Sequence, residues 1–145
     1  MTENELISEL ERLREQADTA EEQESAMKAL SECAEFLGKL SGIDLLKYGA
    51  EAADTYYTLG DMLTNDAGDI EGGINAVKMS VLILCRLALE DEKYFDDAAS
   101  QCEELTAFLE DAKAPDSRKF MRYSRKLNSF DRTSATKELI SMLSE

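Results

Sequence analysis

Four acidic residues have the types and spacing that a metal site requires. Glu32 and Glu35 lie three residues apart, and Glu51 and Asp54 repeat that spacing further along the chain. Residues three apart share one face of a helix, and an antiparallel turn near Gly42 would set the two pairs at matching heights. Mg²⁺ prefers carboxylate oxygens as ligands. The spacing therefore predicts a magnesium site, with solvated surface acids as the alternative.

Three segments around these acids resemble the motifs of the all-α nucleoside triphosphate pyrophosphohydrolases, which include the MazG-type enzymes and phosphoribosyl-ATP pyrophosphatase. They are Ser31–Leu37 (SECAEFL), Gly49–Leu59 (GAEAADTYYTL) and, more loosely, Gly68–Met79 (GDIEGGINAVKM), so that the resemblance covers about residues 20–80. It implies an enzyme whose Mg²⁺, held by the four acids, activates water for attack on phosphorus. It also implies that Tyr57 stacks on the base and that Lys78 is the basic residue of the substrate site.

Charge is distributed very unevenly along the 145 residues, which carry a net charge of −15. Residues 1–117 hold 28 Asp and Glu against 9 Lys and Arg, a net charge of −19, whereas residues 118–145 hold 3 against 7, a net charge of +4. Solubility alone needs far less charge than this. We therefore expect a single acidic helical domain over residues 1–145, with a short basic C-terminal segment over residues 118–145.

Such an acidic body suits a non-enzymatic protein without a cofactor that binds a basic surface, such as that of a nucleic-acid-binding protein. DNA mimics, nuclease immunity proteins and other inhibitors use this charge complementarity, which speeds association and selects the partner. The alternatives are an acidic scaffold charged for solubility and the Mg²⁺-dependent pyrophosphohydrolase. The candidate partner-binding residues are Asp96, Asp97, Glu103 and Glu104.

The basic segment has two possible roles. Its cations alternate with aromatic residues, as in proteins that contact phosphates, but the acidic body would repel nucleic acid. Docking of the segment onto the acidic body, within the chain or between subunits, is therefore the preferred interpretation. The cations of its first helix are Arg118, Lys119, Arg122, Arg125 and Lys126.

The composition predicts an all-α fold, because long stretches rich in Ala, Leu, Glu and Met contain only one proline. Apolar residues at helical spacing indicate an antiparallel helical bundle of about six or seven helices. We expect capping boxes at Thr2 and Thr19, a helix end at Ser41-Gly42 and a loop from Asn65 to Gly73. The expected helices span residues 3–17, 20–40, 44–63, 73–90, 92–112, 117–129 and 134–144.

The expected helix over residues 73–90 is apolar nearly all round, which is typical of a central helix or of one half in a subunit interface. We expect a homodimer that uses this helix or a neighbouring one. Its longest apolar run, Val81–Cys85, is too short to span a membrane. The chain has no histidine, which excludes Ser–His and Cys–His nucleophiles.

The three cysteines are odd in number and widely spaced, which predicts buried free thiols rather than disulfides. No signal peptide is recognised at the start of the sequence. Both observations favour a cytoplasmic location, where thiols stay reduced.

Overall fold

The computed structural model describes residues 2–144, which contain no strand and form seven α-helices and one short 3₁₀-helix. The elements are α1 (Glu3–Thr19), α2 (Gln23–Ile43), α3 (Leu45–Asn65), α4 (Ile70–Glu90), η1 (Glu92–Tyr94), α5 (Phe95–Asp111), α6 (Ser117–Lys126) and α7 (Arg132–Leu143). Helices make up 85% of the structure. The prediction of an all-α fold with six or seven helices is confirmed.

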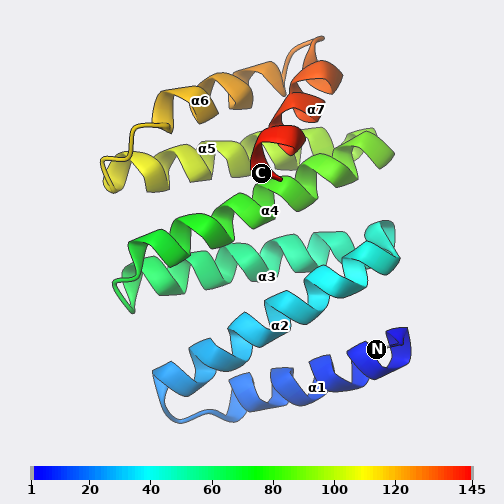
Figure 1. Cartoon of the computed structure of the whole chain (residues 1–145), viewed down its shortest axis with the longest axis vertical. Coiled ribbons are helices and arrows are strands. Elements are labelled where there is room, and N and C mark those ends of the chain that lie inside the picture. The colour runs from blue at the N-terminus through cyan, green and yellow to red at the C-terminus, as the bar shows by residue number, and fades with distance from the viewer. Residues whose placement is uncertain (1, 145) are drawn as a thin grey trace.

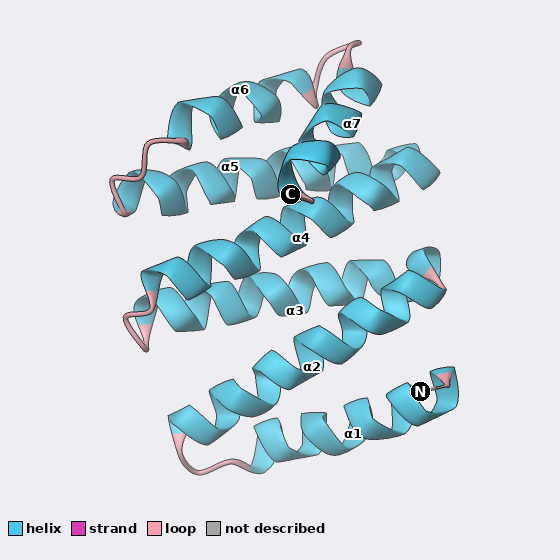
Figure 2. Cartoon of the chain, in the orientation of Figure 1, coloured by secondary structure: helices cyan, strands magenta, loops and turns pink. Residues whose placement is uncertain are grey.

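The helices stack along the longest axis of the molecule in the order of the chain, with α1 at one end and α6 at the other (Figure 1). From α1 to α6, each helix packs mainly on its neighbours in sequence, while α7 packs on α4 and contacts α6. Short loops join successive helices at alternate sides of the stack (Figure 2). The antiparallel bundle is thus an open stack, in which α1 and α6 each have one face without a neighbouring helix.

Helix α4 forms the centre of the core. It packs on α3, α5 and α7, and eleven of its residues are buried. Met79 and Leu89 remain 36% and 39% exposed. Helix α4 is long enough and apolar enough (mean hydropathy 1.5) to span a membrane, but 61% of its most apolar stretch is buried inside the protein. Its all-round apolar composition therefore fits a central position within one chain, while the homodimer stays a prediction.

The first capping box is confirmed and the second is wrong. The hydroxyl of Thr2 accepts a hydrogen bond from the Glu5 amide (3.2 Å) and donates one to Glu5 Oε1 (3.1 Å). Thr19 is instead the last residue of α1, and its hydroxyl donates back to the carbonyl of Glu15 (2.7 Å). Helix α2 begins after Glu22, whose side chain makes no capping hydrogen bond.

The predicted end of the second helix at Ser41-Gly42 is also wrong. Gly42 does not adopt a positive φ, and α2 continues to Ile43. The break comes at Asp44, whose carboxylate accepts a hydrogen bond from the Lys47 amide (3.2 Å) and so starts α3. An acidic N-cap, rather than a glycine C-cap, sets this boundary.

The glycine-rich loop is shorter than predicted because Asp69 caps α4, accepting a hydrogen bond from the Gly72 amide (2.9 Å). Gly72 and Gly73 therefore lie inside α4, and Gly68 supplies the turn with a φ of 70°. A Cβ atom on Gly73 would lie 2.9 Å from the carbonyl oxygen of Gly60, and a Cβ atom on Gly60 would lie 2.9 Å from the carbonyl oxygen of Gly73. These two glycines allow the close approach of α3 and α4.

Candidate functional site

The four acids of the predicted magnesium site do not form one cluster. Helices α2 and α3 pack side by side as expected, but Glu51 pairs with Arg14 of α1. Glu35 pairs with Lys39 of its own helix (Oε1–Nζ 3.8 Å), and Asp54 is exposed. No group of three or more Cys, Asp or Glu side chains in residues 2–144 is placed to hold a metal ion.

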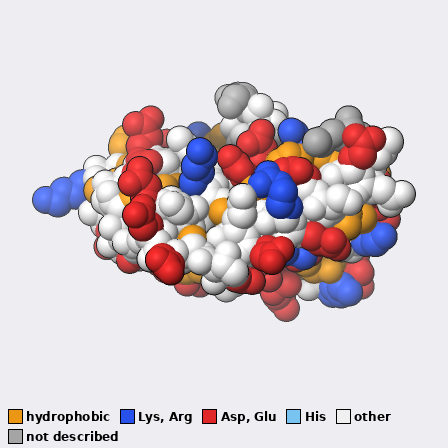
Figure 3. All heavy atoms as spheres, turned by 90° about the horizontal axis from the view of Figure 1, so that it is seen from below, with side chains coloured by type: hydrophobic (Ala, Val, Ile, Leu, Met, Phe, Trp, Pro, Cys, Tyr) orange, Lys and Arg blue, Asp and Glu red, His pale blue; other side chains and the backbone are white. Residues whose placement is uncertain are grey.

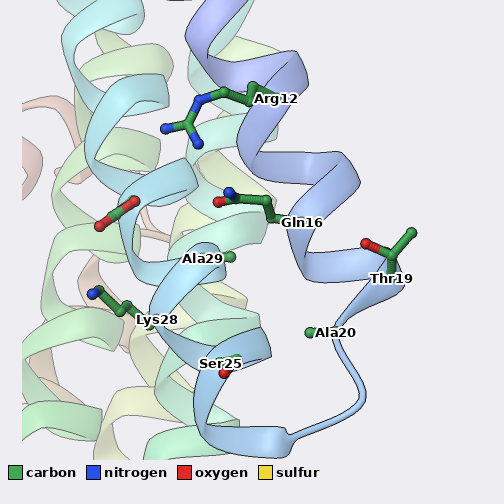
Figure 4. Close-up of a pocket in the computed structure, with 8 residues that line it drawn as sticks. Arg12, Gln16, Thr19, Ala20, Ser25, Lys28 and Ala29 are labelled. Carbon is green, nitrogen blue, oxygen red and sulfur yellow. The ribbon is translucent and has the colours of Figure 1, made fainter.

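Glu32 lines a hollow of about 420 Å³ between α1 and α2. Arg12 and Gln16 extend from α1 toward α2 in this hollow (Figure 4). The pKa of Arg12 is raised, mainly by its hydrogen bond to Glu9 and to a smaller extent by the charge of Glu32. Glu32 therefore faces a cation of α1, Arg12.

The two residues expected to bind substrate make contacts between helices, and their role in binding stays a prediction. The hydroxyl of Tyr57 donates to Glu104 Oε2 (3.2 Å), and its ring meets Phe108 edge-on with centroids 6.3 Å apart. Burial raises the pKa of Tyr57, and the charge of Glu104 adds to this. Lys78 Nζ lies 5.9 Å from the centroid of the Phe120 ring, in another hollow of about 380 Å³. Tyr57 thus links α3 to α5, and Lys78 links α4 to α6.

The acids predicted to bind a partner share the outer face of α5, where they are all exposed. Glu110 and Asp111 continue this face, because they follow Glu103 and Glu104 by seven residues, which is about two turns of helix. Sequence reasoning missed these two residues, although the seven-residue spacing would have found them. We call the following set the α5 acidic face: Asp96, Asp97, Glu103, Glu104, Glu110 and Asp111.

Within residues 2–144, none of these carboxylates has a basic partner. Helix α5 contains no Lys or Arg, and none of the ion pairs in the described part of the chain includes a residue of the α5 acidic face. The buried side of α5 is apolar and includes Phe95, Cys102 and Leu105. The helix is therefore fixed in the core while its charges project into solvent.

The basic helix α6 is not neutralised by the acidic body. Its apolar side packs on α5, and Phe120 and Leu127 are buried. Its five cations are exposed, and none forms an ion pair among residues 2–144. The segment therefore docks within the chain as predicted: α6 docks through apolar contacts, and Arg132 of α7 adds an ion pair with Glu92 of η1 (3.2 Å).

The cysteines are free and buried, as predicted. Burial raises the pKa of Cys85 and of Cys102 to about 12, and it also raises the pKa of Cys33. The thiolate is the reactive form of cysteine. These thiols are therefore protonated at neutral pH and act as small apolar core residues.

Two charged faces distinguish this surface: the carboxylates of α5 and the cations of α6. Seen from the α1 end, Asp and Glu side chains spread across the whole width of the molecule, with fewer Lys and Arg between them (Figure 3).

The resemblance to pyrophosphohydrolases stays a prediction. No family model, curated protein or solved structure matches the chain.

Proposed function

We propose that the protein is a non-enzymatic binding protein that engages a basic macromolecular surface through the α5 acidic face. One observation carries the proposal: six exposed carboxylates lie on a single helix that has no cation, and none of them is ion-paired in residues 2–144. Like charges held this close repel one another and destabilise the compact state. A basic partner relieves that repulsion.

The partner class follows from how the charges are held. A rigid helix presents them as a row about 24 Å long, and the buried side of α5 fixes the row in place. A nucleic-acid-binding protein offers a basic groove of matching length. Occupation of that groove would exclude nucleic acid, so inhibition by mimicry is the expected consequence.

Charge complementarity should act mainly on the rate of association. An exposed ion pair contributes at most about 1 kcal/mol, whereas long-range attraction raises the association rate and selects among partners. The proposed location is the cytoplasm, because three free thiols suit a reducing compartment.

The test is displacement of nucleic acid. A panel of purified basic DNA-binding proteins is loaded with a fluorescent DNA duplex, and release of the duplex is followed as this protein is added. We expect release from at least one member of the panel, and we expect it to weaken steeply as salt screens the charges.

Two double variants that change the net charge equally distinguish the effect of the α5 acidic face on displacement from the effect of net charge. Glu103→Lys with Glu110→Lys should weaken displacement about tenfold, given up to about 1 kcal/mol for each lost contact. Glu11→Lys with Glu15→Lys on α1 should have a much smaller effect. Equal effects of the two variants, no displacement from any member of the panel, or indifference to salt would contradict the proposal.

A further inference from the structure

The two ends of the helix stack carry opposite charge. Helix α6 contains five cations and no acid, a net charge of +5. Helix α1, at the other end of the longest axis (Figure 1), contains six acids and two arginines, a net charge of −4. Each of these helices buries one side mainly on the next helix of the stack and leaves its outer side open.

All the cations of α6 face outward. With 3.6 residues per turn, they occupy an arc of about 120° directly opposite the buried side chains of Phe120, Ser124 and Leu127. Part of this surface is hollowed, and the hollow measures about 240 Å³, ample room for a carboxylate among the cations. Its lining residues are Lys119, Arg122, Tyr123 and Lys126. We call the five cations the α6 basic face.

The acids of α1 fall into two groups: acids that form ion pairs and exposed acids that do not. Glu9 pairs with Arg12, and Glu3 pairs with Lys47 of α3 (Oε1–Nζ 3.6 Å). The remaining acids of α1 are exposed and form no ion pair in residues 2–144. This set, the α1 acidic face, consists of Glu5, Glu11, Glu15 and Asp18.

We propose that copies of this chain associate head to tail, with the α6 basic face of one copy on the α1 acidic face of the next. Because the two faces lie at opposite ends of the stack, one copy can use both at once. Such a heterologous contact generates a ring if its rotation closes and an open chain of copies if it does not, and faces at opposite ends of the stack favour the open chain. A nucleic acid on α6 would instead face a protein of net charge −15, which opposes its binding.

The contact should be weak, and both lower and higher salt concentrations should weaken it further. Helix α6 has ten residues and is about 15 Å long, so the interface is smaller than those of stable complexes. At low ionic strength the net charge of −15 drives copies apart, whereas at 1 M salt a Debye length of about 3 Å screens the local attraction. Association is therefore strongest near 0.15 M salt.

Sedimentation equilibrium over protein concentrations from about 10 to 500 μM tests this, a range suited to a small interface. The average mass should rise with concentration at 0.15 M salt and fall back toward that of a monomer at 1 M salt. Lys119→Glu with Arg122→Glu should lower the association constant at least tenfold, and so should Glu11→Lys with Glu15→Lys. All four side chains are exposed, and circular dichroism verifies that the variants fold.

Mixing the two variants gives the decisive result. The first keeps an intact α1 acidic face and the second an intact α6 basic face, so an equimolar mixture should recover association, at least to a 1:1 complex, that neither variant shows alone. The matched control, Glu103→Lys with Glu110→Lys on α5, should associate like the unaltered protein. This control also separates the inference from the function proposed for α5.

Three outcomes would overturn the inference. One is a monomeric protein at every concentration and salt. Another is association that persists unchanged in both α1 and α6 variants. The third is a monomeric protein that binds a fluorescent single-stranded oligonucleotide through Lys119 and Arg122, which would make nucleic acid the ligand of α6.

Discussion

At the scale of single residues, burial controls the chemistry of the thiols. With the pKa of Cys85 and Cys102 at about 12, almost no thiolate is present at pH 8. We expect an aromatic disulfide reagent to leave the native protein unlabelled at this pH and to label three thiols after denaturation. Rapid labelling of the native protein would show that the core opens around α4 and α5.

The same residues predict a loss of stability at alkaline pH. The Cys85 thiol ionises near pH 9.0 in an unfolded chain and near pH 12 in the folded protein. Between these values the unfolded state releases a proton that the folded state retains, so the free energy of unfolding falls as pH rises through that window. Urea denaturation at pH 8 and at pH 10.5 measures the fall. Cys85→Ala should be less stable at both pH values but should show a shallower dependence on pH, whereas equal slopes would contradict the assignment.

Glu51 separates the two functions that the sequence suggested. Its ion pair with Arg14 joins half-exposed side chains, so Glu51→Gln should change the free energy of unfolding by at most about 1 kcal/mol. Under the proposed binding function, we expect no release of pyrophosphate from a panel of nucleoside triphosphates with Mg²⁺. Turnover by the unaltered protein that disappears in the folded Glu51→Gln variant would instead support the pyrophosphohydrolase prediction.

This residue also illustrates what the sequence could not supply. Spacing along α2 and α3 correctly predicted that the two helices would pack as a pair. It carried no information about a third helix, and α1 supplies the cation that pairs with Glu51. The outer face of α5 was predictable from spacing, because the apolar stripe of a helix indicates which side is buried and the acids lie opposite it.

At the scale of elements, the contact between α3 and α4 depends on two glycines. A Cβ atom on Gly60 would lie 2.7 Å from Val77 Cγ2, and one on Gly73 would collide with the Thr64 hydroxyl and crowd the backbone of α3. We expect Gly60→Ala and Gly73→Ala each to lower the free energy of unfolding by about 1–3 kcal/mol, measured by urea denaturation.

Gly42 provides the matched control. It lies in α2, and no atom lies within 4 Å of the Cβ that alanine would add. Gly42→Ala should leave stability unchanged or raise it by about 0.5–1 kcal/mol, the helical preference of alanine over glycine. Equal losses at the three positions would show that the close approach of α3 and α4 is not what these glycines provide.

Helix boundaries show why element prediction was correct in type and less accurate in position. Apolar stripes identified every helix, because each helix must bury one side. The ends depended on single hydrogen bonds, such as those that Thr19 makes within α1 and that Asp44 and Asp69 make at the starts of α3 and α4. Glycine at Gly42 and Gly73 indicated breaks where the helix in fact continues.

At the scale of the whole molecule, stability should vary along the stack. Helix α1 packs mainly on α2, and its links to α3 include polar contacts, such as the hydrogen bond that Tyr48 donates to Glu3 (2.5 Å). Helix α4, by contrast, packs on three helices. When each element contacts mainly its neighbours, stability approaches a sum of local terms, and end elements open at lower cost than central ones.

Hydrogen exchange on two core variants measures this directly. Leu13 in α1 and Val81 in α4 are both fully buried. Leu13→Ala should lower the free energy of unfolding by about 2–5 kcal/mol, and Val81→Ala should lower it by somewhat less, because a smaller side chain is removed. Leu13→Ala should reduce amide protection in α1 and α2 while α5 and α6 keep theirs, because no direct contact carries the loss across the stack. Val81→Ala should reduce protection in α3, α5 and α7 together, since all three pack on α4. A uniform loss of protection in both variants would mean that the seven helices unfold as one cooperative unit, and that their arrangement as a stack has no consequence for how the ends open.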